Sequence, residues 1–398
     1  MRKLTYRNEL IKHLYFSGAL SCAELSAMMK KSLPLITSTL NELIAEGHVM
    51  ETGLAPSTGG RRSLMYSLSS DFIYIVSIAM DQFITRIAIV DLHNNPVSGI
   101  HKFELPLDNN PGTLQHITDL IEHVISLSGI DKDKIAGIGI GMPGLVDSAA
   151  GINYTFLAYP NKSITAYISK KTQLPVYIEN DSSIIALAEK KFGAAQNSRN
   201  SMVINIGWGI GLGLILNSEL FRGENGFAGE FSHIPIFQNG KLCSCGKRGC
   251  LETASSLMVV LDKIREGLQS GKQSLFQGMS SDRNYEKDMD SMIEAVKGGD
   301  QFVIGLISEA GYTIGRGVAV LIHLLNPEKI ILTGRGVALG NIWLSPIQQA
   351  LNEHCIPLMV AGTNIILSEL GYNAEIIGGA ALVMDNYMMA GHHKNKIN

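Results

Sequence analysis

Two strand-rich units of the same kind follow one another in this chain, and this repetition constrains the fold more than any other feature. The first unit has three β-rich runs, a helix and a buried strand, at residues 73–80, 84–90, 97–103, 113–127 and 135–140. The second has two strands around a glycine-rich turn, then a helix and a strand, at residues 202–206, 214–216, 302–325 and 329–333. This order predicts an α/β fold, and the duplication predicts two lobes with a ligand cleft between them.

Length and composition limit the number of domains and the class of protein that this chain can form. A chain of 398 residues is long for one domain and predicts two or three. Its apolar runs are much shorter than the roughly 18 to 20 residues of a membrane-spanning helix, and its first residues do not resemble a signal peptide. Five cysteines, an odd number, favour a reducing compartment over a disulfide framework. We therefore expect a cytoplasmic protein without a membrane partner.

The first 70 residues have the pattern of a winged helix-turn-helix domain. Apolar side chains at helical spacing predict three helices, at residues 6–16, 22–30 and 34–46, and Ser21 with Glu24 forms a capping box for the second. Two alternating runs, at residues 48–52 and 63–68, then predict a hairpin whose loop contains two glycines and two arginines.

A domain of this kind would bind double-stranded DNA, with its third helix in the major groove and its wing on phosphates or in the minor groove. The expected contacts are Pro34, Thr37, Ser38, Asn41, Arg61 and Arg62. The segment has eight basic and five acidic side chains, a net charge of +3, although the whole chain has −3. A head that binds another protein is the alternative, but it does not explain two arginines beside two glycines.

A histidine and three cysteines lie close together in the second unit, in the spacing of a metal site. His233 is followed by Cys243, Cys245 and Cys250, a set that Zn²⁺ accepts in closed tetrahedral sites. Such a zinc ion would be structural, because no coordination position stays open for hydrolysis. The spacing of the cysteines departs from the common zinc knuckle, and buried thiols beside a surface histidine are the alternative.

Carboxylates occur on both sides of this cluster and also at the end of a strand in the first unit. Glu230 and Glu252 flank the cluster, and together with His233 they offer acceptors for several hydroxyl groups of a polyol such as a sugar. Asn180 and Asp181 follow the strand at 175–178 and begin a helix. Asp181 is either the N-cap of that helix or a group that holds and deprotonates a ligand hydroxyl.

The segments around these residues resemble the ROK family, which joins sugar-responsive repressors of the N-acetylglucosamine and xylose type to bacterial sugar kinases. The resemblance covers essentially the whole chain and is most specific at residues 229–233 and 243–252. It implies a two-lobed, actin-like (ribonuclease-H-like) body behind the DNA-binding head. It also implies that Asn180, Asp181, Glu230, His233, Glu252 and Gly144 bind sugar, with Asp181 matching the catalytic base of the kinases, and that His233, Cys243, Cys245 and Cys250 bind zinc.

The same reading divides the chain into three parts. The head would occupy residues 1–70, the N-terminal lobe 71–195 and the C-terminal lobe 196–377, with a polar insertion at about 269–300. A last helix at about 378–392 would pack back on the N-terminal lobe.

The sequence departs from the kinases of this family at the nucleotide site. Those kinases have Asp-x-Gly-Gly-Thr-Lys in the first hairpin, where glycines let backbone N–H groups approach the phosphates of ATP. Here Phe83 and Ile84 replace both glycines. The remnants of the site are Asp81, Thr85, Gly207, Gly209 and Gly211, and we expect the three glycines to serve turn geometry. We therefore do not expect ATP as a cofactor.

These observations predict a sugar-responsive transcriptional regulator, a repressor of carbohydrate-utilisation genes, that works as a homodimer or homotetramer on paired DNA half-sites. An ATP-dependent sugar kinase with an added DNA-binding head is the alternative, and Asp181 would then be its base. A scaffold that uses the head for protein contacts is a third possibility.

Overall fold

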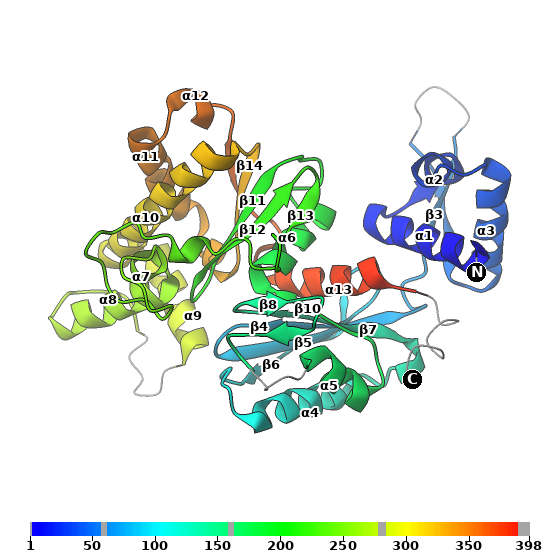
Figure 1. Ribbon diagram of the computed structural model, residues 1–398, viewed down its shortest axis with the longest axis horizontal. Helices are drawn as coiled ribbons and strands as arrows, with labels where there is room; N and C mark the ends of the chain where they lie inside the picture. The colour runs from blue at the N-terminus through cyan, green and yellow to red at the C-terminus, as the bar shows by residue number, and fades with distance from the viewer. Residues whose placement is uncertain (1, 57–61, 158–162, 278–283, 389–398) are drawn as a thin grey trace.

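The computed structural model describes residues 2–56, 62–157, 163–277 and 284–388, and Figure 1 shows a small head beside two lobes. The head begins with three helices, α1 (Arg2–Ser17), α2 (Cys22–Met29) and α3 (Leu33–Ala45). The hairpin strands β2 (Val49–Leu54) and β3 (Leu64–Leu68) follow. The winged helix-turn-helix prediction is confirmed, and the capping box of Ser21 and Glu24 begins α2. Strand β1 (Leu20–Ser21), which pairs with β3, was missed because two residues have no periodicity.

The N lobe is built on a five-stranded sheet with the strand order β10-β7-β4-β5-β6. Its strands are β4 (Tyr74–Met80), β5 (Ile84–Val90), β6 (Pro96–Glu104), β7 (Ile135–Met142) and β10 (Val176–Asn180). Two helices, α4 (Pro111–Ser128) and α5 (Ile164–Thr172), cover one face, where an aliphatic core excludes water. A short hairpin of β8 (Val146–Asp147) and β9 (Ile152–Asn153) connects β7 to α5.

The C lobe repeats this arrangement, with the strand order β13-β12-β11-β14-β15. Its strands are β11 (Ser201–Ile206), β12 (Ile210–Leu216), β13 (Glu219–Phe221), β14 (Lys329–Thr333) and β15 (Asn364–Leu367). The outer face is covered mainly by α8 (Leu257–Gln269), α9 (Tyr285–Lys297), α10 (Gln301–Leu325) and α11 (Leu344–His354). In both sheets the first three strands along the chain pair antiparallel, and the last two extend the sheet in parallel from the first strand. The predicted duplication is therefore confirmed.

Two helices, α6 (Asp181–Phe192) and α13 (Ala374–Asn386), lie between the sheets and pack against each other. Helix α13 approaches the N-lobe sheet so closely that a Cβ on Gly139 would lie 2.1 Å from the carbonyl oxygen of Gly379. It begins at residue 374, four residues before the expected start, and part of the expected end at 389–392 lies outside the described residues. Positions 278–283 of the insertion also lie outside them.

The remaining short helices are α7 (Glu252–Ser255) and α12 (Pro357–Val360), with single 3₁₀ segments at Lys132–Lys134, Phe231–His233, Arg335–Trp343 and Gly371–Asn373. None of the helices in the described part of the chain is both long and apolar enough to span a bilayer.

Candidate functional site

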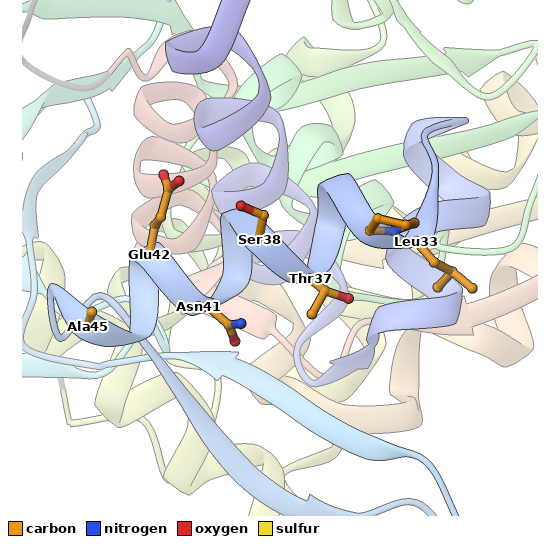
Figure 2. A pocket seen from close by; sticks show the side chains of 7 residues that line it. Leu33, Thr37, Ser38, Asn41, Glu42 and Ala45 are labelled. Atoms are coloured by element: carbon orange, nitrogen blue, oxygen red, sulfur yellow. The ribbon is translucent and has the colours of Figure 1, made fainter.

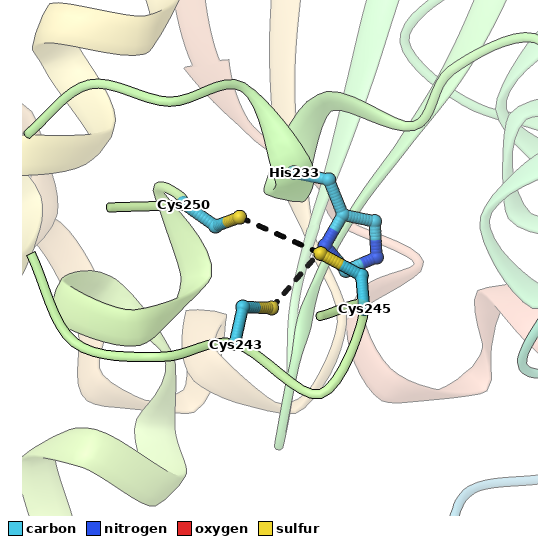
Figure 3. A group of neighbouring side chains, drawn as sticks. All are labelled: His233, Cys243, Cys245 and Cys250. Atoms are coloured by element: carbon cyan, nitrogen blue, oxygen red, sulfur yellow. Dashed lines mark hydrogen bonds between the residues drawn. The ribbon is translucent and has the colours of Figure 1, made fainter. Parts of the chain in front are cut away.

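The four expected metal ligands meet in one place on the C lobe (Figure 3). His233 ends a 3₁₀ turn, and the cysteines lie on the loop that leads into α7. Two glycines in the left-handed region, Gly246 (φ 83°) and Gly249 (φ 79°), turn this loop back on itself. A Cβ at Gly249 would collide with the carbonyl oxygen of Phe237, so the loop requires glycine there.

The distances within this cluster are compatible with a tetrahedral zinc site. One candidate ligand atom from each residue lies within 4.8 Å of the other three. The Sγ atoms of Cys245 and Cys250 are 3.7 Å apart, and Sγ of Cys243 lies 3.5 Å from Nδ1 of His233. Zinc–sulfur bonds of about 2.3 Å and zinc–nitrogen bonds of about 2.0 Å give tetrahedral S···S and S···N edges of roughly 3.8 and 3.5 Å. The donor set and its geometry therefore fit zinc, held by all four side chains.

The electrostatics of the thiols are consistent with a site that needs a cation. Burial raises the pKa of the Cys250 thiol to about 12. Hydrogen bonding to the backbone of Lys247 lowers the pKa of Cys245. A bound Zn²⁺ would convert the thiols to thiolates, because metal ligation requires the deprotonated form.

His233 connects this cluster with the neighbouring carboxylate. Its Nδ1 faces the cysteines, whereas its Nε2 lies 3.7 Å from Oε2 of Glu230. Metal ligation through one nitrogen fixes the ring and leaves the other nitrogen in a defined direction. The cluster therefore aims the second nitrogen of His233 toward the same space that Glu230 faces.

Asn180 and Asp181 stand at the start of α6, opposite the C lobe. Asn180, and not Asp181, is the N-cap, because its Oδ1 accepts hydrogen bonds from the backbone N–H groups of Ser182 and Ser183. Its Nδ2 donates to the carbonyl oxygen of Gly144, which has φ 96°. Asp181 is the first residue inside the helix and accepts from the N–H and the hydroxyl of Ser182. The N-cap alternative for Asp181 was therefore wrong.

Three carboxylates from the two lobes influence one another. Burial raises the pKa of Glu230; His233 opposes that rise, and Asp181 and Glu252 add to it. Burial likewise raises the pKa values of Asp181 and Glu252. Like charges gathered in a partly desolvated space favour a ligand that donates hydrogen bonds, such as a hydroxyl-rich molecule.

Aromatic side chains pack together at the turn that holds Phe83, where the sequence predicted the remnant of a nucleotide site. Phe83, in the turn between β4 and β5, stacks on Tyr285 of α9 with ring centroids 3.9 Å apart. Trp208, in the facing turn between β11 and β12, completes the cluster 5.4 Å from Tyr285. Thr85 is fully buried, and its hydroxyl has no partner among the residues described. In the first turn the N–H groups of Phe83 and Ile84 donate to Oδ1 of Asp81, so they are not open to phosphates.

A buried arginine that the sequence reading missed joins the lobes at the same place. Arg335 follows β14, is 6% exposed, and donates to Oδ2 of Asp81 at 2.8 Å and to Oε1 of Glu286 at 2.5 Å. Its guanidinium lies 4.5 Å from the ring centroid of Trp208. Although burial raises it, hydrogen bonds from Lys102 and Arg335 hold the pKa of Glu286 below its ordinary value. The sequence signal that could have identified Arg335 is its position, directly after a glycine at the end of a buried strand.

The glycines at 207–213 serve helix packing more than turn geometry. Gly211 and Gly213 lie within β12, where a Cβ on Gly213 would come within 2.4 Å of the carbonyl oxygen of Ser182 in α6. A Cβ on Gly211 would collide with the hydroxyl of Ser182, and one on Gly209 would lie 2.8 Å from Glu252 Oε2. Only residues 207–209 form the turn, so the expectation of a longer glycine turn was wrong.

The expected DNA contacts of α3 share one exposed face (Figure 2). A surface hollow runs along this face and is lined by Leu33, Pro34, Thr37, Ser38, Asn41, Glu42 and Ala45. On the opposite face Ile36, Leu40 and Leu43 are buried in the core of the head. Arg62 is exposed at the base of the wing, whereas Arg61 lies outside the described residues.

Known proteins are similar to this chain over nearly its whole length. The model of the ROK family matches residues 82–386. The xylose repressor of Bacillus spizizenii is 29% identical over 384 residues, which cover 95% of this chain and 94% of that protein. A solved ROK family transcriptional regulator, a homologue of the E. coli MLC protein, shares 27% identity with a TM-score of 0.77 and 96% coverage of both chains. The ROK family glucokinase from Streptomyces griseus, solved with glucose and AMPPNP, shares 25% identity with a TM-score of 0.68 and covers 78% of this chain and 98% of its own. The family model spans both lobes, and the solved regulator matches the head as well, so the resemblance is confirmed: this chain belongs to the ROK family.

Proposed function

We propose that this protein is a sugar-responsive, DNA-binding transcriptional regulator that represses carbohydrate-utilisation genes. The main support for DNA binding is the orientation of α3. It presents Thr37, Ser38 and Asn41 on an exposed face, while its other face is buried in the head. Small polar side chains on the second helix of a helix-turn-helix can reach base edges in the major groove. The likeness over the whole chain to a xylose repressor and to a solved transcriptional regulator supports this reading.

The sugar would bind between the lobes, at Asn180, Asp181, Glu230, His233 and Glu252; the effect of Asp181 and Glu252 on the pKa of Glu230 supports this grouping. The raised pKa values of Asp181, Glu230 and Glu252 show that burial destabilises their charged forms. Hydrogen bonds from sugar hydroxyl groups would stabilise these charged forms. Zinc would act only on the shape of this site, by fixing the loop that bears Cys243, Cys245 and Cys250 and the ring of His233. The likeness of the lobes to a glucokinase solved with glucose supports a sugar as the ligand class.

The kinase alternative has less support. Phe83, Tyr285 and Trp208 pack together at the two hairpin turns, and Arg335 donates hydrogen bonds to Asp81, Glu286 and the hydroxyl of Tyr372. A nucleotide would have to displace this packed cluster, and the first turn has no glycine to approach its phosphates. We therefore propose that Asp181 contacts a sugar hydroxyl without phosphoryl transfer.

The test uses DNA selected by the full-length protein from a random pool. Affinity for the selected duplex is measured by fluorescence anisotropy, alone and with xylose, glucose, amino sugars and their phosphates. Asn41→Ala is expected to weaken binding about 10-fold or more, whereas Gln348→Ala, an exposed change on α11, should have no effect. Failure to enrich any sequence, or equal affinity in the presence of every sugar, contradicts the proposal. Incubation with ATP, Mg²⁺ and the same sugars tests the kinase alternative, since phosphate transfer that Asp181→Asn abolishes would establish it.

A further inference from the structure

Helix α6 reaches from the proposed sugar site to the DNA-binding head. Asp181 begins the helix between the lobes, and Phe192 ends it beside α1 of the head. Twelve helical residues span about 18 Å. One helix therefore begins at the proposed site and ends in contact with the head; Figure 1 shows α6 and α13 between the two lobes and the head beside them.

The last turn of α6 makes specific contacts with α1. The ring of Phe192 lies 5.5 Å from that of Tyr15, edge to face, and 5.9 Å from that of Phe16. Nζ of Lys191 lies 4.1 Å from the ring centroid of Phe16 and 3.1 Å from a carboxylate oxygen of Asp385 in α13. These contacts bind α1 to both helices that lie between the lobes.

Further bonds hold α1 against the body. Nζ of Lys12 donates to the carbonyl oxygen of Asp385 at 2.5 Å, and the hydroxyl of Tyr15 donates to Oδ1 of Asn94 at 2.5 Å. On its other side α1 buries Leu10 and Leu14 in the core that also contains Leu40 of α3. A displacement of α1 would therefore carry the recognition helix with it, because packed cores move as units.

Helix α6 has little freedom to deform between these two ends. A Cβ on Gly378 of α13 would lie 2.2 Å from the carbonyl oxygen of Ile184, and one on Gly213 of β12 would lie 2.4 Å from that of Ser182. Its backbone is thus in close contact with α13 on one side and with the C-lobe sheet on the other. Any movement between the lobes that shifts the start of α6 must shift its end as well.

We infer that α6 transmits occupancy of the site between the lobes to the recognition helix, through the contact of Lys191 and Phe192 with Tyr15 and Phe16. This inference rests on the proposed function, because it requires a sugar that changes DNA affinity. A sugar would act by binding one arrangement of the two lobes more tightly than the other, and α6 would pass the difference between these arrangements to α1 and so to the head.

The test compares wild type with the double variant Lys191→Met and Phe192→Leu, which keeps apolar volume but removes the ammonium group and the ring. Sugar affinity is measured by calorimetry, and affinity for the selected duplex is measured with and without the effective sugar. In wild type we expect the sugar to change DNA affinity about 10-fold or more. In the double variant we expect this ratio to fall below about 2-fold, while sugar affinity and sugar-free DNA affinity each stay within about 3-fold of wild type.

A matched control variant shows whether the effect is specific to the contact between α6 and α1, and a second variant is used if the first does not fold. Lys171→Met, an exposed change on α5, should keep the full sugar response. If the double variant fails to unfold cooperatively, Lys191→Met alone is used, and it should at least halve the logarithm of the ratio. A variant that binds both ligands and retains the wild-type ratio overturns the inference and leaves the proposed function standing. A wild type that responds to no sugar overturns the proposed function, and the inference with it.

Discussion

Nη2 of Arg335 lies 2.8 Å from Oδ2 of Asp81, so a guanidinium of the C lobe and a carboxylate of the N lobe meet where the two hairpin turns face each other. Asp81 also accepts hydrogen bonds from the N–H groups of Phe83 and Ile84 through its other oxygen. The aspartate that the kinase motif places beside phosphates is here fully occupied by protein groups. This contact joins the two lobes directly.

Arg335→Ala is expected to lower the free energy of unfolding by about 2 kcal/mol, because it removes a buried guanidinium and leaves the half-buried carboxylates of Asp81 and Glu286 without their shared cation. Urea denaturation followed by intrinsic tryptophan fluorescence measures the loss, since Trp208 lies against the guanidinium. Arg199→Ala is the control, as Arg199 is exposed and bonds only to Asn217 among the interactions described. Equal stability of both variants would contradict a bridging role for Arg335.

Purified protein is expected to contain one zinc ion per chain, measured by atomic absorption after dialysis. Cys250→Ala should reduce the content to below about a tenth and lower the midpoint of thermal unfolding, because metal binding stabilises only the folded loop. Cys355→Ala also removes a buried thiol but lies outside the cluster, so it should retain the metal. Wild-type protein free of zinc after purification in zinc-containing medium would refute the site.

Glu252→Gln is expected to weaken sugar binding about 10- to 100-fold, since a hydrogen bond to a charged acceptor contributes about 1.5 to 3 kcal/mol. Isothermal titration with the sugar that alters DNA affinity gives the value. Glu224→Gln changes an exposed glutamate in the loop before Glu230 and should leave the affinity unchanged. Equal affinities for wild type and Glu252→Gln would remove Glu252 from the proposed site.

Asp181→Asn is expected to raise the thermal midpoint of the sugar-free protein at pH 7 by about 2 °C or more. Burial raises the pKa of Asp181 above the 3.8 of the unfolded chain, so the native state holds more protons than the unfolded state between the two pKa values. The stability contributed by the protonated acid is complete below pH 3.8 and is lost as the pH rises through the native pKa.

The pH series separates this effect from a general gain in packing. The difference between Asp181→Asn and wild type should shrink as the pH falls toward about 4. Asp290→Asn, an exposed change on α9, should show no difference at any pH. A stabilisation of Asp181→Asn that does not vary with pH would show that charge burial is not its cause.

Much of the local structure follows from short-range patterns. The capping box of Ser21 and Glu24, the buried stripe of α3 and the alternation of the strands are interactions within one element, so periodicity and end signals were enough to predict them. The cluster of His233 with Cys243, Cys245 and Cys250 could also be predicted, because the four residues lie close together in the sequence. The short strand β1 and the start of α13 were not, since neither has a strong local signal.

What the amino-acid pattern could not decide is which distant side chains meet. Arg335 and Asp81 are separated by more than half of the chain, and no local rule pairs them; only the packing of two lobes and α9 brings them together. The same holds for the stacking of Phe83 on Tyr285 and of Phe192 beside Tyr15. Local propensity determined the helices, the strands and the metal loop, because those depend on neighbours in sequence. The cluster of Phe83, Tyr285 and Trp208 and the contact of α6 with the head arise only from tertiary packing, because burial of one surface selects partners that the order of residues does not name.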